Sequence, residues 1–355
     1  MRLISPVLKH VIYPGLARAG YFERWNRSDR PVVITYHGIL PAGYVSIDPM
    51  LDGHLISATS FRAQLKVLMK KYNIVTPEEF RLWIEGRLTL PPRAVLLTCD
   101  DGLLNVTQEM LPVLDEMHLQ CLFFVTGASL DGPASMLWHE ELFLLLLKAR
   151  PGSVRFSGET EIVFPQPVSC LRAIWSRLIK KLSAFDQASR TQLLDEIRTQ
   201  LGIPESWQSE YSENQVTLQR FFTMDGQQLK KIVECGMTVG AHTLSHPMLS
   251  RMSRANAWEE IATCRSRLAE LLGVPVWAVA YPFGNEIAAC AREFELAREA
   301  GFTCAFMNTE SSNGQFAFPR IHVSAGMTLG ELEAHISGVD RALRLASHLR
   351  TGARA

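Results

Sequence analysis

The chain has 355 residues, 47% of them hydrophobic, and its 36 Lys and Arg residues equal its 36 Asp and Glu residues in number. A chain of this length can bury a full core, and the zero net charge gives no support for nucleic-acid or anionic-membrane binding through bulk charge. The seven cysteines are odd in number and lie mostly in apolar runs, which favours a reducing compartment over a disulfide framework.

Residues 1–30 are predicted to form a helical segment. Residues 1–20 mix Leu, Ile and Val with basic side chains and contain neither an uninterrupted apolar stretch nor a clear cleavage site, so no signal peptide is predicted. The longest apolar run, residues 142–147, is much shorter than the roughly 20 residues that a membrane-spanning helix needs. We therefore expect a cytoplasmic protein whose N-terminal helix packs against the core or touches a membrane surface.

Seven short apolar runs are predicted to be β-strands, and most run into polar or glycine-containing residues. In chain order they are residues 31–35, 94–97, 121–125, 237–241, 277–280, 303–306 and 318–323. Parallel α/β sheets and barrels present their functional loops at the carboxyl ends of the strands. The pattern therefore predicts an α/β fold with a closed or nearly closed barrel.

Helices are expected between the first two of these strands and in a long insertion. Phe61, Leu65 and Leu68 recur at helical spacing, and Thr76 followed by Pro77 is typical of a second helix start. Residues 138–150 and 171–201 are predicted as helices, and residues 151–168 as a loop or small hairpin. The expected division is an N-terminal segment at 1–30, a first part of the barrel at 31–134, a mainly helical insertion at 135–222, a second part of the barrel at 223–340 and a basic tail at 341–355. The insertion would serve as a lid or packing appendage, or as a wall of a cleft.

Two short segments together make a candidate metal site. Residues 98–102 read Thr-Cys-Asp-Asp-Gly and residues 242–247 read His-Thr-Leu-Ser-His-Pro, each directly after a predicted strand. If the turn after Ala241 is helical, His242 and His246 lie on one face. Two imidazoles and one carboxylate suit zinc and leave a coordination position open for water, while the other carboxylate is free to act as a base.

These two segments, with Phe-Phe-Val-Thr-Gly at 123–127 and Tyr-Pro-Phe-Gly at 281–284, resemble the successive motifs of the polysaccharide deacetylases. These are the NodB-homology proteins, or carbohydrate esterase family 4. The resemblance covers residues 31–323 and is interrupted by the insertion. It implies a distorted (β/α) barrel and a divalent-metal N-deacetylase that acts on N-acetylated sugars.

The resemblance also assigns roles to residues of this chain. It implies that Asp101, His242 and His246 bind the metal, which is expected to be zinc, with cobalt, nickel or manganese as alternatives. Asp100 is the expected general base toward a water molecule that the metal activates. The turn formed by Tyr281, Pro282 and Phe283 is expected to contact the substrate and to offer a backbone N–H to the oxyanion.

A general acid is needed as well, because an amine leaves poorly unless it is protonated, and histidine suits this role. The segment Thr-Tyr-His-Gly at 35–38 resembles that of family members with an N-terminal Tyr-His motif, so His37 is the expected acid. His322 is the alternative, with a half-exposed strand position as its simpler interpretation. His54 lies in a predicted loop, where it would be solvated or would line the cleft.

The chain also departs from the family pattern. An arginine that usually orients the catalytic aspartate is replaced here by Ala280, and Arg320 could supply the guanidinium from another direction. Cys99 stands where an aromatic residue is usual, and its acidic neighbours disfavour a reactive thiolate, so we interpret it as a packing residue.

The sequence leaves the exact reaction open. The leading hypothesis is removal of N-acetyl groups from a polysaccharide or a glycan precursor, and a lipid-linked precursor would bring peripheral membrane contact. The alternatives are hydrolysis of another amide on the same fold and a non-catalytic glycan-binding protein. The oligomeric state is not predicted.

Overall fold

A barrel of parallel strands forms the centre of the molecule in the computed structural model, which describes residues 6–25, 30–127, 130, 132, 134–155, 161–309 and 314–343. Within these residues seven strands close in the order β1, β10, β9, β8, β7, β4, β3 and back to β1. The predicted α/β barrel is therefore confirmed, and all seven predicted runs form its strands. Their bounds are Val32–Tyr36 (β1), Ala94–Cys99 (β3), Leu122–Val125 (β4), Thr238–Ala241 (β7), Ala278–Ala280 (β8), Cys304–Met307 (β9) and Phe318–His322 (β10).

Among the described strands an eighth, β2 (Asn73–Val75), pairs with β3 alone and is not part of the closed ring. It pairs with the first half of β3, from Ala94 to Leu96, whereas β4 pairs with the last two residues of β3. Because β1 holds the other edge of β3, the strands β2 and β4 share a single edge. The sequence analysis missed β2, since three residues between two helices are too few to give a periodic signal.

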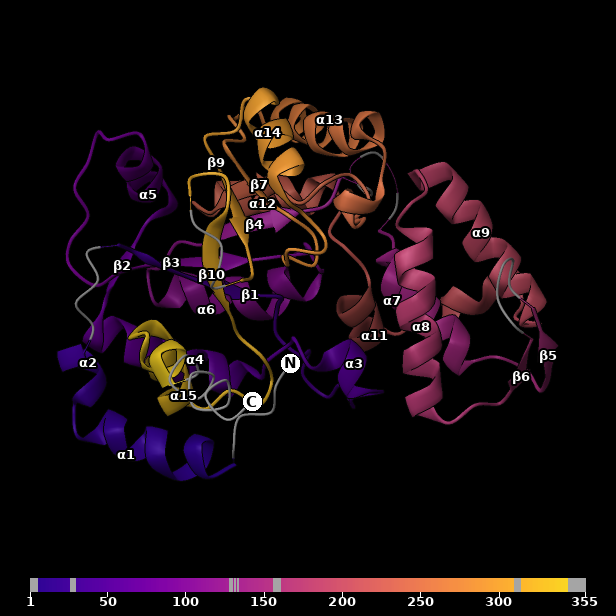
Figure 1. Ribbon diagram of the computed structural model, residues 1–355, viewed down its shortest axis with the longest axis horizontal. Helices are drawn as coiled ribbons and strands as arrows, with labels where there is room; N and C mark the ends of the chain where they lie inside the picture. Colours follow the sequence, from indigo (N-terminus) through magenta and orange to yellow (C-terminus); the bar gives the residue numbers. More distant parts are fainter. Residues whose placement is uncertain are drawn as a thin grey trace, which may run out of the picture.

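Helices surround the barrel (Figure 1). The helix α5 begins as predicted, because Oγ1 of Thr76 accepts a hydrogen bond from the backbone N–H of Glu79 at 3.1 Å and Pro77 occupies the first turn. The helices are α4 (Ala58–Lys71), α5 (Pro77–Ile84), α6 (Leu111–Glu116), α12 (Gly226–Glu234), α13 (Arg254–Leu272), α14 (Ala291–Glu299) and α15 (Leu329–Ile336), with the shorter α3 (Pro49–Asp52), η2 (Val106–Met110) and η4 (Leu249–Arg251).

The N-terminal residues form the short helices η1 (Leu8–Ile12), α1 (Tyr13–Arg18) and α2 (Tyr21–Trp25). They pack near α15 (Figure 1), where the hydroxyl of Tyr13 donates to Asp340 at 2.7 Å and Lys9 lies 3.3 Å from Glu331. Among the described residues, no helix combines the length and the apolarity that crossing a bilayer requires. Residues 344–355 of the predicted tail lie outside the described residues.

The segment predicted as an insertion is mainly helical and lies to one side of the barrel (Figure 1). Its elements are α7 (Trp138–Leu147), β5 (Gly152–Val154), β6 (Ile162–Phe164), α8 (Val168–Leu182), α9 (Gln187–Gln200), η3 (Glu205–Gln208), α10 (Ser209–Ser212) and α11 (Gln215–Phe221). The hairpin prediction is confirmed by the antiparallel pairing of β5 and β6. The single helix predicted over 171–201 is wrong, because Asp186 caps a new helix by accepting from the N–H of Ser189 at 2.8 Å.

We keep the division at 135 and 222 as a proposal, and two observations support it. Met136 forms a β-bridge with Phe222, so the chain enters and leaves the segment at adjacent points. The segment also has a hydrophobic cluster separate from that of the barrel, which includes Phe143, Leu178 and Trp207. The cysteines are all free, with Cys99, Cys121, Cys264 and Cys304 buried.

A buried ion network joins the insertion to a barrel loop. Arg220 of α11 lies 2.6 Å from Asp52 and 2.8 Å from Glu140, and its guanidinium also donates to the carbonyl of Leu51 at 2.6 Å. All three charged side chains are at most 4% exposed. Removal of the shared cation leaves two buried carboxylates without a cationic partner at hydrogen-bond distance, although Asp52 keeps hydrogen bonds from Ser46 and Ile47.

We expect Arg220→Met to lower the free energy of unfolding by about 3–5 kcal/mol, because one partner of a buried ion pair is removed. Denaturant unfolding followed by circular dichroism measures this. Arg254→Met breaks the exposed pair with Glu299 and serves as the control, with an expected loss below about 1 kcal/mol. Equal stability of the two variants would contradict the assignment.

Candidate metal centre and catalytic site

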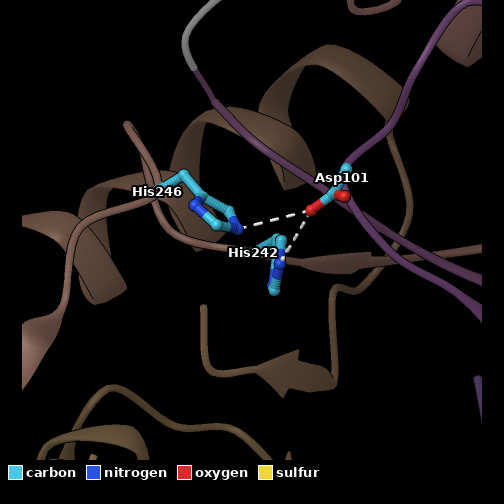
Figure 2. A group of neighbouring side chains, drawn as sticks. All are labelled: Asp101, His242 and His246. Atoms are coloured by element: carbon cyan, nitrogen blue, oxygen red, sulfur yellow. Dashed lines mark ion pairs between the residues drawn. The ribbon is translucent and has the colours of Figure 1, made fainter. Parts of the chain in front are cut away.

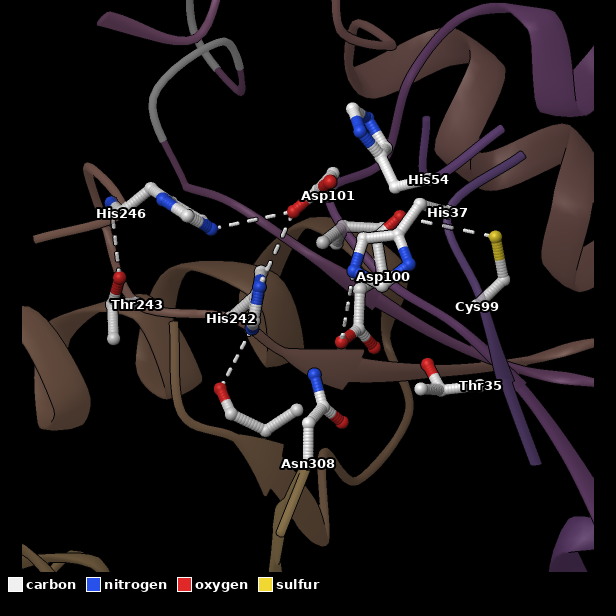
Figure 3. A network of polar contacts seen from close by, with 12 residues as sticks. Thr35, His37, His54, Cys99, Asp100, Asp101, His242, Thr243, His246 and Asn308 are labelled. Carbon is white, nitrogen blue, oxygen red and sulfur yellow. Dashed lines mark hydrogen bonds and ion pairs between the residues drawn. The ribbon is translucent and has the colours of Figure 1, made fainter. Parts of the chain in front are cut away.

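The two adjacent aspartates at the end of β3 point toward different partners (Figure 3). The N–H of Asp100 donates to Tyr36 at 2.9 Å and so continues the pairing of β3 with β1. Asp101 then has φ of 73° and Gly102 has φ of 72°, and a side chain at Gly102 would lie 3.1 Å from Val125. This left-handed turn separates the two carboxylates.

Asp101 faces both histidines of the second motif (Figure 2). Its Oδ1 lies 3.4 Å from Nε2 of His242 and 3.3 Å from Nε2 of His246. The ligand atoms of the three side chains all lie within 4.8 Å of one another, and each residue is at most 5% exposed. Burial would raise the pKa of Asp101, but hydrogen bonds from the two histidines outweigh it and hold the pKa well below its usual range. The carboxylate is therefore ionised and ready to bind a cation.

The turn that carries the two histidines is not helical. Residues 242–246 contain no helical residue, and Thr243 and His246 have φ of 65° and 57°. Oγ1 of Thr243 accepts from the N–H of His246 at 3.0 Å, and the carbonyl of Thr243 accepts from Gly127 at 2.9 Å. These local hydrogen bonds replace helical ones, so the helical turn considered in the sequence analysis does not form, yet both imidazoles still face Asp101.

The tautomer of His242 is set by the barrel backbone. Its Nδ1 lies 2.7 Å from the carbonyl oxygen of Ala280, which only accepts, so Nδ1 carries a proton and Nε2 is the ring nitrogen that faces Asp101 and would bind a metal. Metal-binding histidines in proteins are commonly oriented in this way by a carbonyl.

Arg320 forms a two-pronged ion pair with Asp100. Its Nη1 and Nη2 lie 2.7 and 2.5 Å from Oδ1 and Oδ2 of the carboxylate, and both residues are at most 3% exposed. The guanidinium therefore reaches Asp100 from β10, as the sequence allowed, and the alanine at 280 leaves no gap in this contact. Burial would raise the pKa of Asp100, but Arg320 and His242 outweigh it and hold the pKa below its usual range.

His37 lies beside Asp100 and contacts two further histidines, His54 and His322 (Figure 3 labels His37 and His54). Nε2 of His37 lies 4.0 Å from Asp100, and the His37 ring lies 4.8 Å from that of His322 and 5.4 Å from that of His54. Burial and the neighbouring His37 lower the pKa of His322 to about 3. The side chain of His54 is only partly exposed and lies 3.8 Å from Glu140. It therefore belongs to this histidine cluster and is not a solvated loop residue.

The turn after β8 fits its prediction only in part. Tyr281 is fully buried and its hydroxyl donates to the carbonyl of Phe316 at 3.1 Å, so its side chain is part of the core and only its backbone is left to contact a substrate. The ring is needed to fill the core, and Pro282 is buried as well. Phe283, with φ of 60°, is partly exposed and its ring lies 5.0 Å from that of His246.

The sequence analysis missed two residues of the insertion that contact a metal-site histidine. Nε1 of Trp138 donates to the carbonyl of His246 at 2.9 Å, and the ring of His139 stacks on the His246 ring at 4.7 Å. Burial and the nearby His246 hold the pKa of His139 well below its usual range. Trp138 was recognised only as the start of a predicted helix, and no local pattern indicates a contact across more than 100 residues of chain.

A third residue of the insertion, Arg190 of α9, holds the histidine turn from outside. Its guanidinium donates to the hydroxyl of Ser245 and lies 5.0 Å from the centre of the Trp138 ring. Ser245 also donates its N–H to Glu260 at 2.8 Å. Arg190 and Glu260 thus fix the residue that directly precedes His246.

We expect Arg190→Met to weaken zinc binding by roughly 10–100-fold, since residues that orient metal ligands typically contribute this much. Competition with a chromophoric chelator measures the zinc affinity. Arg198→Met, on the same helix but bonded to Asp195 and Ile203, is the control and should bind zinc like the unmodified chain. Equal affinities for all three proteins would show that the insertion has no influence on the centre.

Comparison with known proteins agrees with this architecture. A family model described as polysaccharide deacetylase matches residues 206–305. IcaB from Ammonifex degensii has 20% identity and a TM-score of 0.52, over 87% of this chain and 98% of its own. The deacetylase PplD of Streptococcus pyogenes, solved with acetate, has 15% identity and a TM-score of 0.53, over 85% and 96% of the two chains. The de-N-acetylase of Aggregatibacter actinomycetemcomitans has 14% identity and a TM-score of 0.53, over 86% and 99%. No curated protein matches the chain.

The seven-stranded parallel barrel with its surrounding helices is a (β/α) barrel of the NodB-homology type. The predicted resemblance to the polysaccharide deacetylase family is therefore confirmed over residues 206–305, and the solved structures show the same fold over most of the chain.

Proposed function

We propose that the protein is a metal-dependent hydrolase that removes N-acetyl groups from amino sugars of a polysaccharide or a glycan precursor. The observation that carries the proposal is one buried site that combines an Asp-His-His group, a second carboxylate held by Arg320 and a histidine beside it. A protein that only binds glycans has no need of a base next to a metal. PplD was solved with acetate, which is the product this reaction would release.

The residues fit a divalent metal. Asp101, His242 and His246 offer one oxygen and two nitrogen atoms, the set that zinc accepts most readily, with cobalt, nickel or manganese as alternatives. Asp101 and His246 both have positive φ values, a backbone conformation that persists only where the surrounding structure fixes it. A bound metal would polarise the acetyl carbonyl and lower the pKa of a water molecule.

The remaining residues of the site would move the protons and stabilise charge. Asp100 is ionised at neutral pH and would accept the proton of the attacking water, with Arg320 fixing the direction of its carboxylate. His37 would protonate the leaving amine. The backbone N–H of Phe283, beside His246, is the group we assign to the oxyanion.

We expect His37→Ala to lower kcat by roughly 10²–10⁴-fold, the usual contribution of a general acid, and His322→Ala to lower it by less than about tenfold. The reason is that His322, with a pKa of about 3, is a neutral imidazole at working pH and is therefore a poor acid. Steady-state rates of acetate release measure both variants. If His322→Ala lowered kcat more than His37→Ala does, His322 would be assigned as the general acid.

Acetate release from N-acetylated oligosaccharides, with and without a chelator, tests the proposed function. The expected result is release that stops on chelation and returns when zinc is added. Release from other amides, but from no sugar in the panel, would indicate a different substrate on the same site. If the metal-loaded protein hydrolysed no amide, the remaining hypothesis would be a non-catalytic glycan-binding protein.

A further inference from the structure

A partly open cavity of about 350 Å³ lies between the insertion and the barrel. One wall is the side of α9 that carries Gln187, Arg190 and Thr191, and a second wall holds Trp138, Trp207 and Gln208. Ser245 of the histidine turn closes the barrel side. The three candidate metal ligands are not among the lining residues, so the cavity adjoins the metal centre but is separate from it.

The cavity contains a buried donor that the described part of the chain leaves without a partner. Arg190 is 2% exposed, and its Nη2 is taken up by Ser245 and lies near Glu260. Its Nη1 has no hydrogen-bond partner in the structure. A buried guanidinium N–H without an acceptor costs free energy, so an oxygen of a ligand is the natural partner for it.

The charge of the lining disfavours an anion as that ligand. The acidic Glu141, Asp195 and Glu205 line the cavity together with only two cations, Arg190 and Arg198. Arg198 is already occupied by Asp195 and by the carbonyl of Ile203 at 2.7 Å. Even with Glu141 protonated, the carboxylates of Asp195 and Glu205 match the two cations, so a phosphate or carboxylate would meet no net positive charge.

The remaining lining suits a neutral, oxygen-rich ligand. Two indoles supply apolar and aromatic surface, and Gln187 and Gln208 supply amides that can both donate and accept. Burial raises the pKa of Glu141 to about 7, so this carboxyl can also donate a hydrogen bond. The volume is at the lower end of the roughly 300–1,000 Å³ typical of small-molecule sites and admits one sugar ring with its substituents.

We propose that this cavity binds one neutral sugar residue of the glycan, an N-acetylhexosamine that lies next to the residue at the metal centre. The inference rests on the proposed function, because it places a second unit of the same substrate. Ser245 directly precedes His246, and Trp138 lines the cavity while donating to the His246 carbonyl at 2.9 Å. The sugar would thus contact the same two residues that hold the histidine turn.

A direct binding experiment uses two neighbouring positions of α9. Thr191 lines the cavity, whereas the exposed Gln192 does not, so Thr191→Trp blocks the cavity and Gln192→Trp is its matched control. The probe is the β-1,4-linked trimer of N-acetylglucosamine, measured by calorimetry in an Asp101→Asn background that prevents turnover. We expect at least a tenfold weaker Kd for Thr191→Trp and less than a twofold change for Gln192→Trp. Gln208→Ala, which removes a donor without adding bulk, should weaken binding in the same direction.

Three results would overturn the proposal. The first is that the Asp101→Asn chain does not bind the trimer. The second is that Thr191→Trp and Gln208→Ala leave the Kd for the trimer unchanged. The third is that inorganic phosphate competes with the trimer. The last would identify an anion site instead.

Turnover separates this inference from the proposed function. In the zinc-loaded chain, Thr191→Trp is expected to raise KM for the trimer with little change in kcat. If acetate release depended on the metal but Thr191→Trp left KM unchanged, the proposed function would stand and sugar binding in the cavity would be rejected. Binding that Thr191→Trp abolishes, in a chain that hydrolyses no amide, would keep the cavity and reject the function.

Discussion

Arg320→Gln is expected to lower kcat/KM at neutral pH by about a hundredfold or more, the effect of disabling a general base. Arg320 binds both oxygens of Asp100 in a site that is almost fully buried. Without the guanidinium, burial is the dominant influence and raises the pKa of Asp100. A larger share of Asp100 is then protonated at a given pH and cannot accept a proton.

The pH profile identifies this cause. In the unmodified chain the pKa of Asp100 is held below its usual range, so activity is lost only as the pH falls through that low value. In Arg320→Gln the acidic limb of kcat/KM should move to higher pH. Arg320→Lys keeps the charge but not the paired geometry, and we expect a smaller shift with partial activity. A lower rate with an unmoved acidic limb would assign Arg320 a purely structural role.

Stability provides a second control for this variant. Arg320→Gln leaves a buried carboxylate unpaired, which destabilises the barrel by itself. The double variant Asp100→Asn/Arg320→Gln removes the buried charge and should recover much of the free energy of unfolding. It should not recover turnover, because the base is absent. Recovery of both would mean that Asp100 is not the base.

Asp101→Asn and His246→Gln are expected to abolish tight zinc binding and to lower acetate release by about 10³-fold or more, because each removes one of three protein ligands. Elemental analysis after dialysis should find one ion per unmodified chain and almost none in either variant. Zinc should also raise the Tm of the unmodified chain, since a ligand at a hundred times its Kd stabilises the folded state by about 2.7 kcal/mol. Neither variant should show this rise.

His139→Gln is the matched control. His139 stacks on His246 at 4.7 Å but is not part of the Asp-His-His group. The variant should keep one zinc ion per chain. If Asp101→Asn and His246→Gln bound zinc as the unmodified chain does, the metal would have to lie elsewhere.

The barrel could be predicted from sequence because its strands are buried on both faces. Such strands appear as short continuous apolar runs, and all seven runs were found. The helix break at Asp186 and the strand β2 were not, since a cap within a long periodic stretch and a three-residue strand give little signal.

In the candidate site, too, local sequence patterns could be recognised and contacts that depend on tertiary packing could not. Asp100, Asp101, His242 and His246 were named from local motifs, and the structure brings all four together, although the histidine turn has a loop conformation. Tyr281 was assigned by its place in a motif, but its hydroxyl bonds to the core. Contacts made by the insertion, such as Trp138 with His246, depend on tertiary packing and could not be read from local patterns.

The bridge between Met136 and Phe222 has a consequence for how the protein could be shortened. Paired backbone at these two points means that a short turn could rejoin the chain after excision of the residues between them, with the barrel strands untouched. The shortened barrel would still carry Asp101 and both histidines. It would lose the ring stacked on His246 and the indole bonded to its carbonyl, so the histidine would face water on that side. We thus expect the insertion to be separable from the barrel along the backbone, while its side chains are part of the environment of the candidate metal centre.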